Sequence, residues 1–263
     1  MKRLTLCADD YAQSPAISAG ILKLVEADRL QAVSCLSESP YWRTNADELL
    51  AAAGDCAIGL HFNLTLPFGQ TGRRVSSLLA QAVARAISGD WVRRRFDEQW
   101  EAFVRVTGRF PDFVDGHQHV HAFPVIREVI VERLHDFVPS CRVRSLSSPA
   151  SLGEVPPKQH LLDRIARPLP RLIAEAGLAT NRFFAGFRPY REGIDFRRIF
   201  RQWLAACPTD TLIMCHPGLR ANDLSDPIAG SRPGEFDYLA SDEFLSDALN
   251  AGVAFKPVRS GIA

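Results

Sequence analysis

Several features that would define whole classes of protein are missing from this sequence of 263 residues. No uninterrupted apolar run approaches the ~18 residues that a membrane-spanning helix needs, so we expect no transmembrane segment. The formal net charge is only +1, which gives no reason to expect nucleic acid or a membrane surface as a partner. The amino-terminal apolar stretch is too short for a signal peptide, so a cytoplasmic protein is expected.

Two further absences concern chemistry. The six cysteines are scattered and form no CxxC pair. Cys7, Cys35 and Cys215 lie in apolar, strand-like runs, so buried free thiols fit better than a disulfide framework. Neither GxGxxG nor GxxxxGK[ST] occurs, and the sequence therefore offers no glycine-rich cradle for nucleotide phosphates.

Short apolar runs alternate with helical patterns along the chain. The runs expected to form strands are residues 4–8, 32–36, 57–66, 113–114, 141–146, 182–187, 211–215 and 253–258. Strands that alternate with helices in this way favour a mostly parallel sheet. The leading interpretation is an α/β fold, a distorted (β/α) TIM-like barrel of about seven to eight strands, closed or nearly closed; an open doubly wound sheet is the alternative.

One catalytic domain over residues 1–263 is expected, with a helical insertion at about residues 67–111. Two helical patterns, 75–87 and 91–107, stand there where a minimal strand–helix unit would have one. Residues 160–176 predict a helix that is kinked or interrupted at Pro168 and Pro170. Residues 222–238 are rich in Pro, Gly and Asp and predict a loop.

The most distinctive stretch is DGHQHVH at residues 115–121, where a predicted strand breaks at Gly116. Its histidines, His117, His119 and His121, stand at alternate positions and would share one face of an extended segment. A polar loop with incidental histidines is one interpretation. A metal or acid–base site is the other, because neutral imidazole is a common metal ligand and a proton carrier near neutral pH.

Polar residues also recur at the carboxyl ends of the predicted strands. They are Asp9 and Asp10, His61, Asp115 and His117, and His216. In a parallel barrel these ends meet on one face, where active sites form. One Asp and two His suit a divalent metal with open positions, a second carboxylate suits a general base, and a histidine on the opposite side suits proton donation.

Each of these residues also has a purely structural interpretation. Asp9 and Asp10 could cap the following helix. His61 could be a hydrogen-bonded core histidine, and His216 could organise a turn before Pro217. Independent structural roles, however, need not all fall at the same strand ends.

Four motifs, in order along the chain, carry a resemblance to a known family. Residues 7–14 (CADDYAQS) resemble N-A-D-D-F-G-x-S, residues 59–65 (GLHFNLT) resemble G-x-H-x-x-L-T, residues 115–124 (DGHQHVHAFP) resemble D-x-H-x-H-x-H-x-x-P, and residues 215–217 resemble a C-H-P strand end. This pattern is similar to that of the YdjC-like carbohydrate deacetylases of the ChbG and HpnK type. The resemblance spans residues 4–219, most of the chain.

The resemblance implies a distorted (β/α) barrel, a divalent metal (Mg²⁺ or Zn²⁺) and hydrolysis of an N-acetyl group from an amino sugar. Carried over by motif, the metal ligands would be Asp10, His61 and His117. Asp9 would match the general base, by analogy with the paired Asp of the NodB-type polysaccharide deacetylases. His216 would match a general acid or a partner of the oxyanion.

The other residues of the third motif would support the ligands. His119 and His121 would orient ligands or contact the substrate, as metal-bound histidine sites require. Asp115 has three open interpretations: it orients His117, it orients another imidazole, or it only shapes the turn at Gly116.

Two departures from the family pattern concern the substrate. Tyr11 and Ala12 replace a Phe-Gly pair, which could reshape the turn beside the base. Arg188 and Arg191 lie at another predicted strand end, where either could bind an anionic part of the substrate such as a phosphate. The alternative for these arginines is a salt bridge to the barrel rim.

The expected function is therefore that of a metal-dependent carbohydrate deacetylase. Its partner would be an N-acetylated sugar, which could also carry a lipid or phosphate group. A barrel of this size often forms a homodimer, although no stretch identifies an interface. Two other classes stay open: a metal-dependent phosphoesterase or sugar isomerase on a similar barrel, and a non-catalytic sugar-binding protein.

Overall fold

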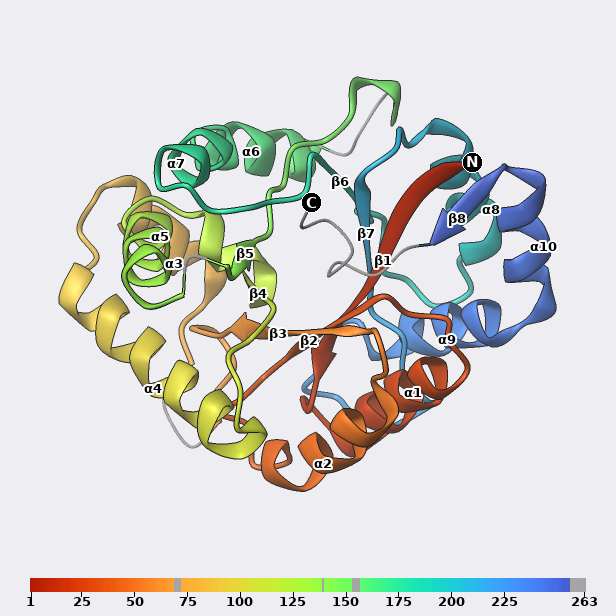
Figure 1. Ribbon diagram of the computed structural model, residues 1–263, viewed down its shortest axis with the longest axis horizontal. Coiled ribbons are helices and arrows are strands. Elements are labelled where there is room, and N and C mark those ends of the chain that lie inside the picture. The colour runs from red at the N-terminus through yellow and green to blue at the C-terminus, as the bar shows by residue number, and fades with distance from the viewer. Residues whose placement is uncertain (69–71, 139, 153–156, 256–263) are drawn as a thin grey trace.

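A parallel sheet that curls on itself forms the centre of the molecule, and helices surround it (Figure 1). The computed structural model describes residues 1–68, 72–138, 140–152 and 157–255. The strands in this part of the chain are β1 (Lys2–Tyr11), β2 (Ala32–Cys35), β3 (Ala57–Phe62), β4 (Phe113–Gly116), β5 (Arg142–Val143), β6 (Phe183–Ala185), β7 (Thr211–Cys215) and β8 (Val253–Phe255). Every pairing between these strands is parallel.

The helices connect successive strands. They are α1 (Pro15–Glu26), α2 (Trp42–Ala52), α3 (Val75–Val83), α4 (Gly89–Thr107), α5 (Ile126–Phe137), α6 (Pro157–Ala166), α7 (Leu169–Glu175), α8 (Phe196–Ala206), α9 (Arg232–Ala240) and α10 (Asp242–Asn250). Short 3₁₀ segments cover His117–Ala122, Ala150–Leu152 and Ala229–Ser231. Both α3 and α4 lie between β3 and β4, and the predicted interruption near Pro168 separates α6 from α7.

The long first strand holds the sheet together. The strand order is β5-β4-β3-β2-β1-β7-β6, and β8 also pairs with β1. The two edges of this path then approach each other, because the Val143 N–H donates to the Ala179 carbonyl (3.0 Å) and the Phe184 N–H donates to the Ser147 carbonyl (2.9 Å). The predicted distorted, nearly closed barrel is thus confirmed, and the open doubly wound sheet is not the architecture.

The sheet is buried on both faces. Every residue of β2, β3, β4 and β7 is buried, which is typical of barrel strands whose inner side chains pack against one another and whose outer side chains pack against helices. Helix α1 begins where Ser14 accepts a hydrogen bond from the Ile17 N–H, with Pro15 in the first turn. All six cysteines are buried and free, as predicted.

One predicted loop is wrong. Residues 222–238 were expected to lack regular structure, but Arg232–Ala240 forms α9. The sequence misleads here because proline and glycine usually break helices. Pro233 lies in the first turn, where a missing N–H breaks no intrahelical bond.

Three predicted strands are clearly shorter than expected, among them the one at 182–187, which covers only Phe183–Ala185 in β6. The strand at 57–66 ends at Phe62, because the Asn63 side-chain oxygen accepts hydrogen bonds from the N–H groups of Thr65 (2.9 Å) and Leu66 (2.8 Å) and turns the chain. The strand at 141–146 is reduced to two residues in β5. Of the strand at 253–258, residues 256–258 lie outside the described part of the chain.

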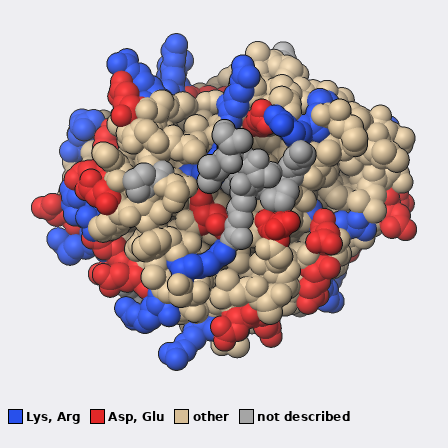
Figure 2. All heavy atoms as spheres, in the orientation of Figure 1, with Lys and Arg blue, Asp and Glu red and all other residues tan. Residues whose placement is uncertain are grey.

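Surface charge follows the small net charge. On the face shown in Figure 2, basic and acidic side chains are interspersed. Among the described residues, no helix combines the length and the hydropathy needed to cross a membrane.

Candidate metal centre

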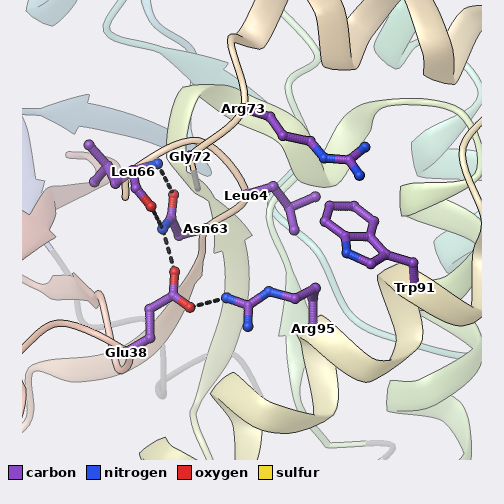
Figure 3. Close-up of a pocket in the computed structure, with 8 residues that line it drawn as sticks. All are labelled: Glu38, Asn63, Leu64, Leu66, Gly72, Arg73, Trp91 and Arg95. Carbon is purple, nitrogen blue, oxygen red and sulfur yellow. Dashed lines mark hydrogen bonds and ion pairs between the residues drawn. The ribbon is translucent and has the colours of Figure 1, made fainter. Parts of the chain in front are cut away.

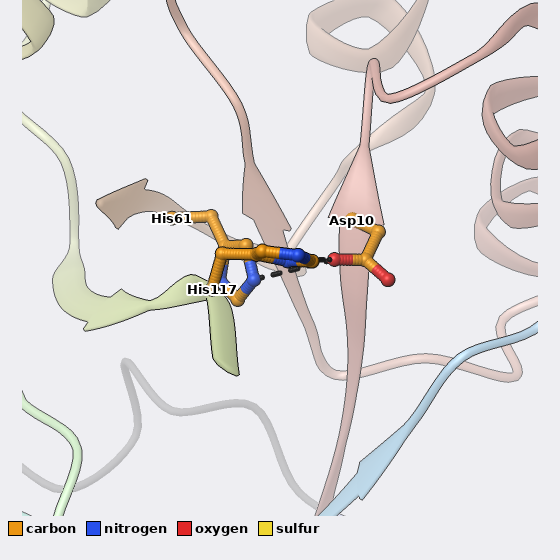
Figure 4. A group of neighbouring side chains, drawn as sticks. All are labelled: Asp10, His61 and His117. Carbon is orange, nitrogen blue, oxygen red and sulfur yellow. Dashed lines mark hydrogen bonds and ion pairs between the residues drawn. The ribbon is translucent and has the colours of Figure 1, made fainter. Parts of the chain in front are cut away.

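Three side chains from three strand ends converge on one point (Figure 4). Asp10 comes from the end of β1, His61 from β3, and His117 directly follows β4. One ligand atom from each lies within 4.8 Å of the other two. Asp10 Oδ1 is 2.9 Å from His117 Nδ1 and 3.3 Å from His61 Nε2. The structure therefore brings together the three predicted ligands, which are separated by more than 50 residues in sequence.

His61 is held from behind by a carboxylate. Its Nδ1 lies 2.7 Å from Asp115 Oδ1 and 3.0 Å from Ser34 Oγ, and Ser34 also donates to Asp115. A carboxylate on one ring nitrogen fixes the tautomer and leaves the other nitrogen free to bind a metal. Of the open interpretations of Asp115, the geometry matches the orientation of an imidazole other than His117.

Asp10 divides its two oxygens between two partners. Oδ1 faces the histidines, whereas Oδ2 accepts a hydrogen bond from Arg232 Nη2 at 2.8 Å. Burial alone would raise the pKa of Asp10, but Arg232 and His117 hold it well below its usual value. The carboxylate is therefore ionised in a buried position, as a metal ligand must be.

The donor set fits a divalent metal. One carboxylate and two imidazoles leave further coordination positions open, which is typical of a catalytic site. Burial opposes protonation of His61, yet Asp115 and Asp10 raise its pKa to about 10. Surroundings that favour a proton so strongly also favour a cation, and a metal would take the place of that proton.

A second cluster of potential ligands lies next to the first, but an arginine already occupies it. Cys7, Asp9 and Asp115 also place one potential ligand atom each within 4.8 Å of one another. Arg144 occupies the space between them. Its Nη1 and Nη2 donate to the two oxygens of Asp9 at 2.7 and 2.6 Å, and Nη2 also contacts Asp115. Two parallel hydrogen bonds of this kind fix the direction of the Asp9 carboxylate.

His216 faces the centre from the end of β7. Its Nδ1 is 3.3 Å from the Tyr190 hydroxyl, and its backbone N–H donates to Glu235 Oε2 at 2.6 Å. Burial lowers the pKa of His216 to about 4, so the ring is neutral at pH 7. A neutral ring suits a hydrogen-bond donor to a developing oxyanion.

Helix α9 clamps this side of the site. Arg232 joins Asp10 to Asp226, whose Oδ2 accepts a hydrogen bond from Arg232 Nε at 2.5 Å. Glu235, one turn further along, holds the backbone of His216 and is ion-paired with Arg188. The structure thus shows the salt-bridge alternative for Arg188, which is buried at 7% exposure with its guanidinium directed at Glu235.

The remaining histidines of the predicted stretch do not share one extended face. Residues 117–122 form a 3₁₀ segment in which Gln118 and His119 have positive φ angles of 53° and 62°. The His121 Nε2 lies 3.1 Å from the Arg144 carbonyl oxygen. The His119 ring packs edge-on against Phe187, with centroids 5.0 Å apart. His119 and His121 therefore pack against groups around the site, and their roles towards a substrate stay predictions.

The turn after Asp9 and Asp10 contains an alanine, Ala12, where the motif that it resembles has a glycine. Ala12 adopts φ 71°, a conformation that glycine reaches more readily. Its N–H donates to Ser18 Oγ at 3.1 Å, and Ser39 Oγ donates to its carbonyl. These bonds hold a strained alanine where a glycine would be relaxed.

Sequence reasoning missed five residues of this region: Ser34, Arg144, Tyr190, Arg232 and Glu235. Arg144 did carry a signal, because it is a charged residue inside a predicted apolar strand, and a buried arginine needs an acidic partner. Arg232 and Glu235 carried none once their helix had been interpreted as a loop.

Comparison with known proteins supplies a family and relatives. Residues 3–249 match the model of a family described as YdjC-like protein. Human carbohydrate deacetylase is 28% identical over 245 residues, 82% of this chain and 75% of the human protein. Chitooligosaccharide deacetylase of Yersinia enterocolitica is 25% identical over 231 residues, 82% of this chain and 81% of that protein. Mouse carbohydrate deacetylase is 31% identical over 166 residues, but the match covers only 52% of its length.

Solved structures agree with the fold. A crystal structure of an Enterococcus faecalis protein superposes with a TM-score of 0.70 at 19% identity, covering 98% of both chains. A peptidoglycan N-acetylglucosamine deacetylase superposes with a TM-score of 0.52 at 14% identity, covering 98% of this chain and 86% of that one. At these identities the likeness concerns the fold alone.

Proposed function

The chain belongs to the YdjC-like protein family, which confirms the resemblance in its motifs, and from that premise we propose that it is a metal-dependent carbohydrate deacetylase. It hydrolyses an N-acetyl group from an amino sugar. The observation that carries the proposal is the convergence of Asp10, His61 and His117 beside an arginine-paired Asp9. The names of the human and Yersinia relatives support the same reaction.

The residues of the chain divide the reaction between them. A bound divalent metal would polarise the acetamide carbonyl and lower the pKa of the attacking water. Asp9 accepts the proton of that water, and Arg144 keeps the carboxylate directed for the transfer. His216 donates its ring N–H to the carbonyl oxygen as negative charge develops there. The proton held on Asp9 then passes to the departing amine, which balances the hydrolysis.

The ligand types favour one of the two candidate metals. Two imidazoles and one carboxylate suit Zn²⁺ better than Mg²⁺, which prefers oxygen ligands. We therefore propose Zn²⁺ as the native metal. Elemental analysis of the purified protein tests this choice.

Cellular location and oligomeric state are also part of the proposal. We propose a cytoplasmic location, because the six free thiols suit a reducing compartment. A homodimer stays a prediction, which light scattering of the purified protein would test.

Acetate release is the direct test of the reaction. We expect acetate from an N-acetylated oligosaccharide when Zn²⁺ is present and none when the metal is removed by a chelator. Asp9→Asn should keep the metal but lose most of the rate. Phosphate release or epimer formation without acetate would instead favour the phosphoesterase or isomerase interpretation, and tight sugar binding without any product would favour a binding protein.

A further inference from the structure

A cavity of about 410 Å³ lies beyond the end of β3 (Figure 3). Its volume falls within the ~300–1,000 Å³ that is typical of small-molecule sites. Asn63 and Leu64 form one wall, Trp91 and Arg95 approach from α4, and Arg73 closes another side. None of these side chains belongs to the metal centre.

The wall next to the strand end is fixed. The Asn63 amide nitrogen donates to the Leu66 carbonyl (3.0 Å) and to Glu38, while its oxygen accepts two backbone N–H groups. At Gly72, an added Cβ would lie 2.4 Å from the Thr65 carbonyl oxygen, so only glycine permits this close approach. The Asn63 side chain therefore shapes this wall but has no spare hydrogen bond for a ligand.

The two arginines of the cavity differ in their partners. Arg95 is ion-paired with both Glu38 and Glu98. Arg73 has no acidic partner among the described residues, and its one side-chain hydrogen bond there is a 3.3 Å contact with Gln81. Arg95 is thus neutralised by carboxylates, whereas the guanidinium of Arg73 is a lining cation without one among the described residues.

The Arg73 guanidinium is also held in place. It stacks over the Trp91 ring with 4.0 Å between Cζ and the ring centroid, as Figure 3 shows. Stacking covers a face of the guanidinium but leaves the N–H groups on its edge available. The Trp91 indole N–H adds a donor with no acceptor in the described part of the chain. A fixed arginine edge of this kind suits two parallel hydrogen bonds to an oxyanion.

The cavity is close to the metal centre along the chain. Asn63, in the cavity wall, follows the proposed ligand His61 by two residues, so the cavity and the metal centre adjoin the same end of β3. A group bound in the cavity can therefore belong to the same substrate as an acetamide at the metal centre.

We propose that this cavity binds a sugar unit that carries an oxyanion, phosphate or carboxylate, with Arg73 as the group that recognises the charge. The proposal rests on the deacetylase function, because it describes the part of the substrate next to the amide that is cleaved. It moves the expected anion recognition from Arg188, which is ion-paired with Glu235, to Arg73. Trp91 acts as a positioning residue that holds the guanidinium.

Direct binding is the first test. Metal-free protein would be titrated by calorimetry with neutral N-acetylglucosamine, with N-acetylglucosamine 6-phosphate and with N-acetylmuramic acid, which carries a carboxylate. We expect at least one anionic sugar to bind about tenfold or more tightly than the neutral one, and Arg73→Gln to remove that preference. The neighbouring Arg74 is exposed, so Arg74→Gln is a matched control that should change nothing.

The comparison of the two anionic sugars identifies the oxyanion. If Arg73→Gln weakens binding of the phosphate sugar alone, the recognised group is a phosphate. If it weakens binding of the carboxylate sugar alone, the recognised group is a carboxylate. Equal binding of all three sugars to the wild-type protein, or equal losses in the Arg73 and Arg74 variants, would overturn the proposal. Trp91→Ala should weaken anionic sugars without affecting the neutral one, whereas a merely structural role would affect both.

A kinetic test separates this inference from the proposed function. Acetate release from matched neutral and anionic substrates should show a raised KM for the anionic one alone in Arg73→Gln, with kcat nearly unchanged. Anion-dependent binding without any acetate would retain the inference about the cavity and refute deacetylation. Equal acetate release from neutral and anionic substrates, in both the wild-type protein and Arg73→Gln, would support deacetylation and refute the inference about the cavity.

Discussion

Two neighbouring acidic clusters share the carboxyl end of the barrel, yet they are used in opposite ways. Asp10, His61 and His117 lie around a position that a cation can occupy. Cys7, Asp9 and Asp115 have the same close spacing, but the Arg144 guanidinium already lies among them. The difference teaches that spacing alone does not identify a metal site. A buried arginine contacts each cluster, but Arg232 binds only Oδ2 of Asp10 and leaves Oδ1 to the histidines, whereas Arg144 occupies both oxygens of Asp9.

The sharpest way to test this comparison is to neutralise the two adjacent carboxylates separately. Asp10→Asn should weaken metal binding by more than about 100-fold, because an ionised ligand is lost. Asp9→Asn should leave metal binding within about threefold but reduce turnover by about 10²–10⁴-fold, the usual contribution of a general base. Metal titration and acetate release measure the two effects, with the exposed Asp55→Asn as a control. If both variants lost the metal, the assignment of Asp10 as a ligand and of Asp9 as a base would be contradicted.

Removing the arginine from the second cluster should destabilise the folded protein. Arg144→Met leaves Asp9 and Asp115 buried without their counter-charge, and we expect the free energy of unfolding to fall by about 3–5 kcal/mol. Arg133→Met, which breaks a partly exposed pair with Asp97, should cost less than about 1 kcal/mol. Urea denaturation of both variants provides the measurement. Similar losses would mean that Arg144 is not needed to balance the cluster.

Lowering the pH should destabilise the protein through one buried histidine beside each cluster. Burial lowers the pKa of His121, next to Arg144, and of His216, next to Asp10, to about 4 each. The unfolded chain takes up these protons below about pH 6.5, whereas the folded protein does not until about pH 4. Stability is thus complete above pH 6.5 and falls towards pH 4, by about 2 kcal/mol per histidine between pH 7 and pH 5.

Denaturation of the metal-free protein at both pH values measures this loss. His121→Gln and His216→Gln should each reduce the dependence on pH, and the exposed His135→Gln should not. An unchanged dependence in the first two variants would contradict the assignment of these histidines as neutral buried groups.

The smallest expected effect concerns the hydroxyl that touches both clusters. Ser34 Oγ contacts His61 and Asp115, so Ser34→Ala should reduce metal affinity by about tenfold, as is usual for groups that orient a ligand. Ser37→Ala removes another buried hydroxyl, which bonds the Gln99 carbonyl at 2.7 Å away from the centre, and should leave the affinity unchanged. Equal affinities in the two variants would show that Ser34 does not orient His61.

The sequence patterns were sufficient to predict the barrel and to place polar residues at its strand ends, and the family resemblance then singled out the three side chains of the open cluster. Period-2 and period-3.6 patterns locate strands and helices, and parallel strands bring their carboxyl ends together whatever their distance along the chain. The arginines that pair with the two adjacent aspartates were not predictable in the same way. Arg144 reaches Asp9 across 135 residues and Arg232 reaches Asp10 across 222, and a single arginine leaves no periodic signal.

Arg188 shows the same limit. Its place at a strand end left both anion binding and a salt bridge open, and its partner Glu235 could not be identified because it lies in a segment interpreted as a loop. Without the helix there was no partner to predict. Local patterns thus identify which residues reach the rim, whereas the ion pairs among them depend on packing between distant elements.

The closure between β5 and β6 has a consequence for local opening of the native protein. Part of this closure depends on side chains rather than on a continuous ladder: Thr180 Oγ1 donates to the Val143 carbonyl (2.6 Å) and Asn181 Nδ2 to the Ser145 carbonyl (3.0 Å). Short strands with few ladder bonds open at low free energy. Deuterium exchange should therefore reach the amides of Val143 and Phe184 well before those of β1, and because Arg144 follows β5 directly, each such opening would also withdraw the guanidinium from Asp9.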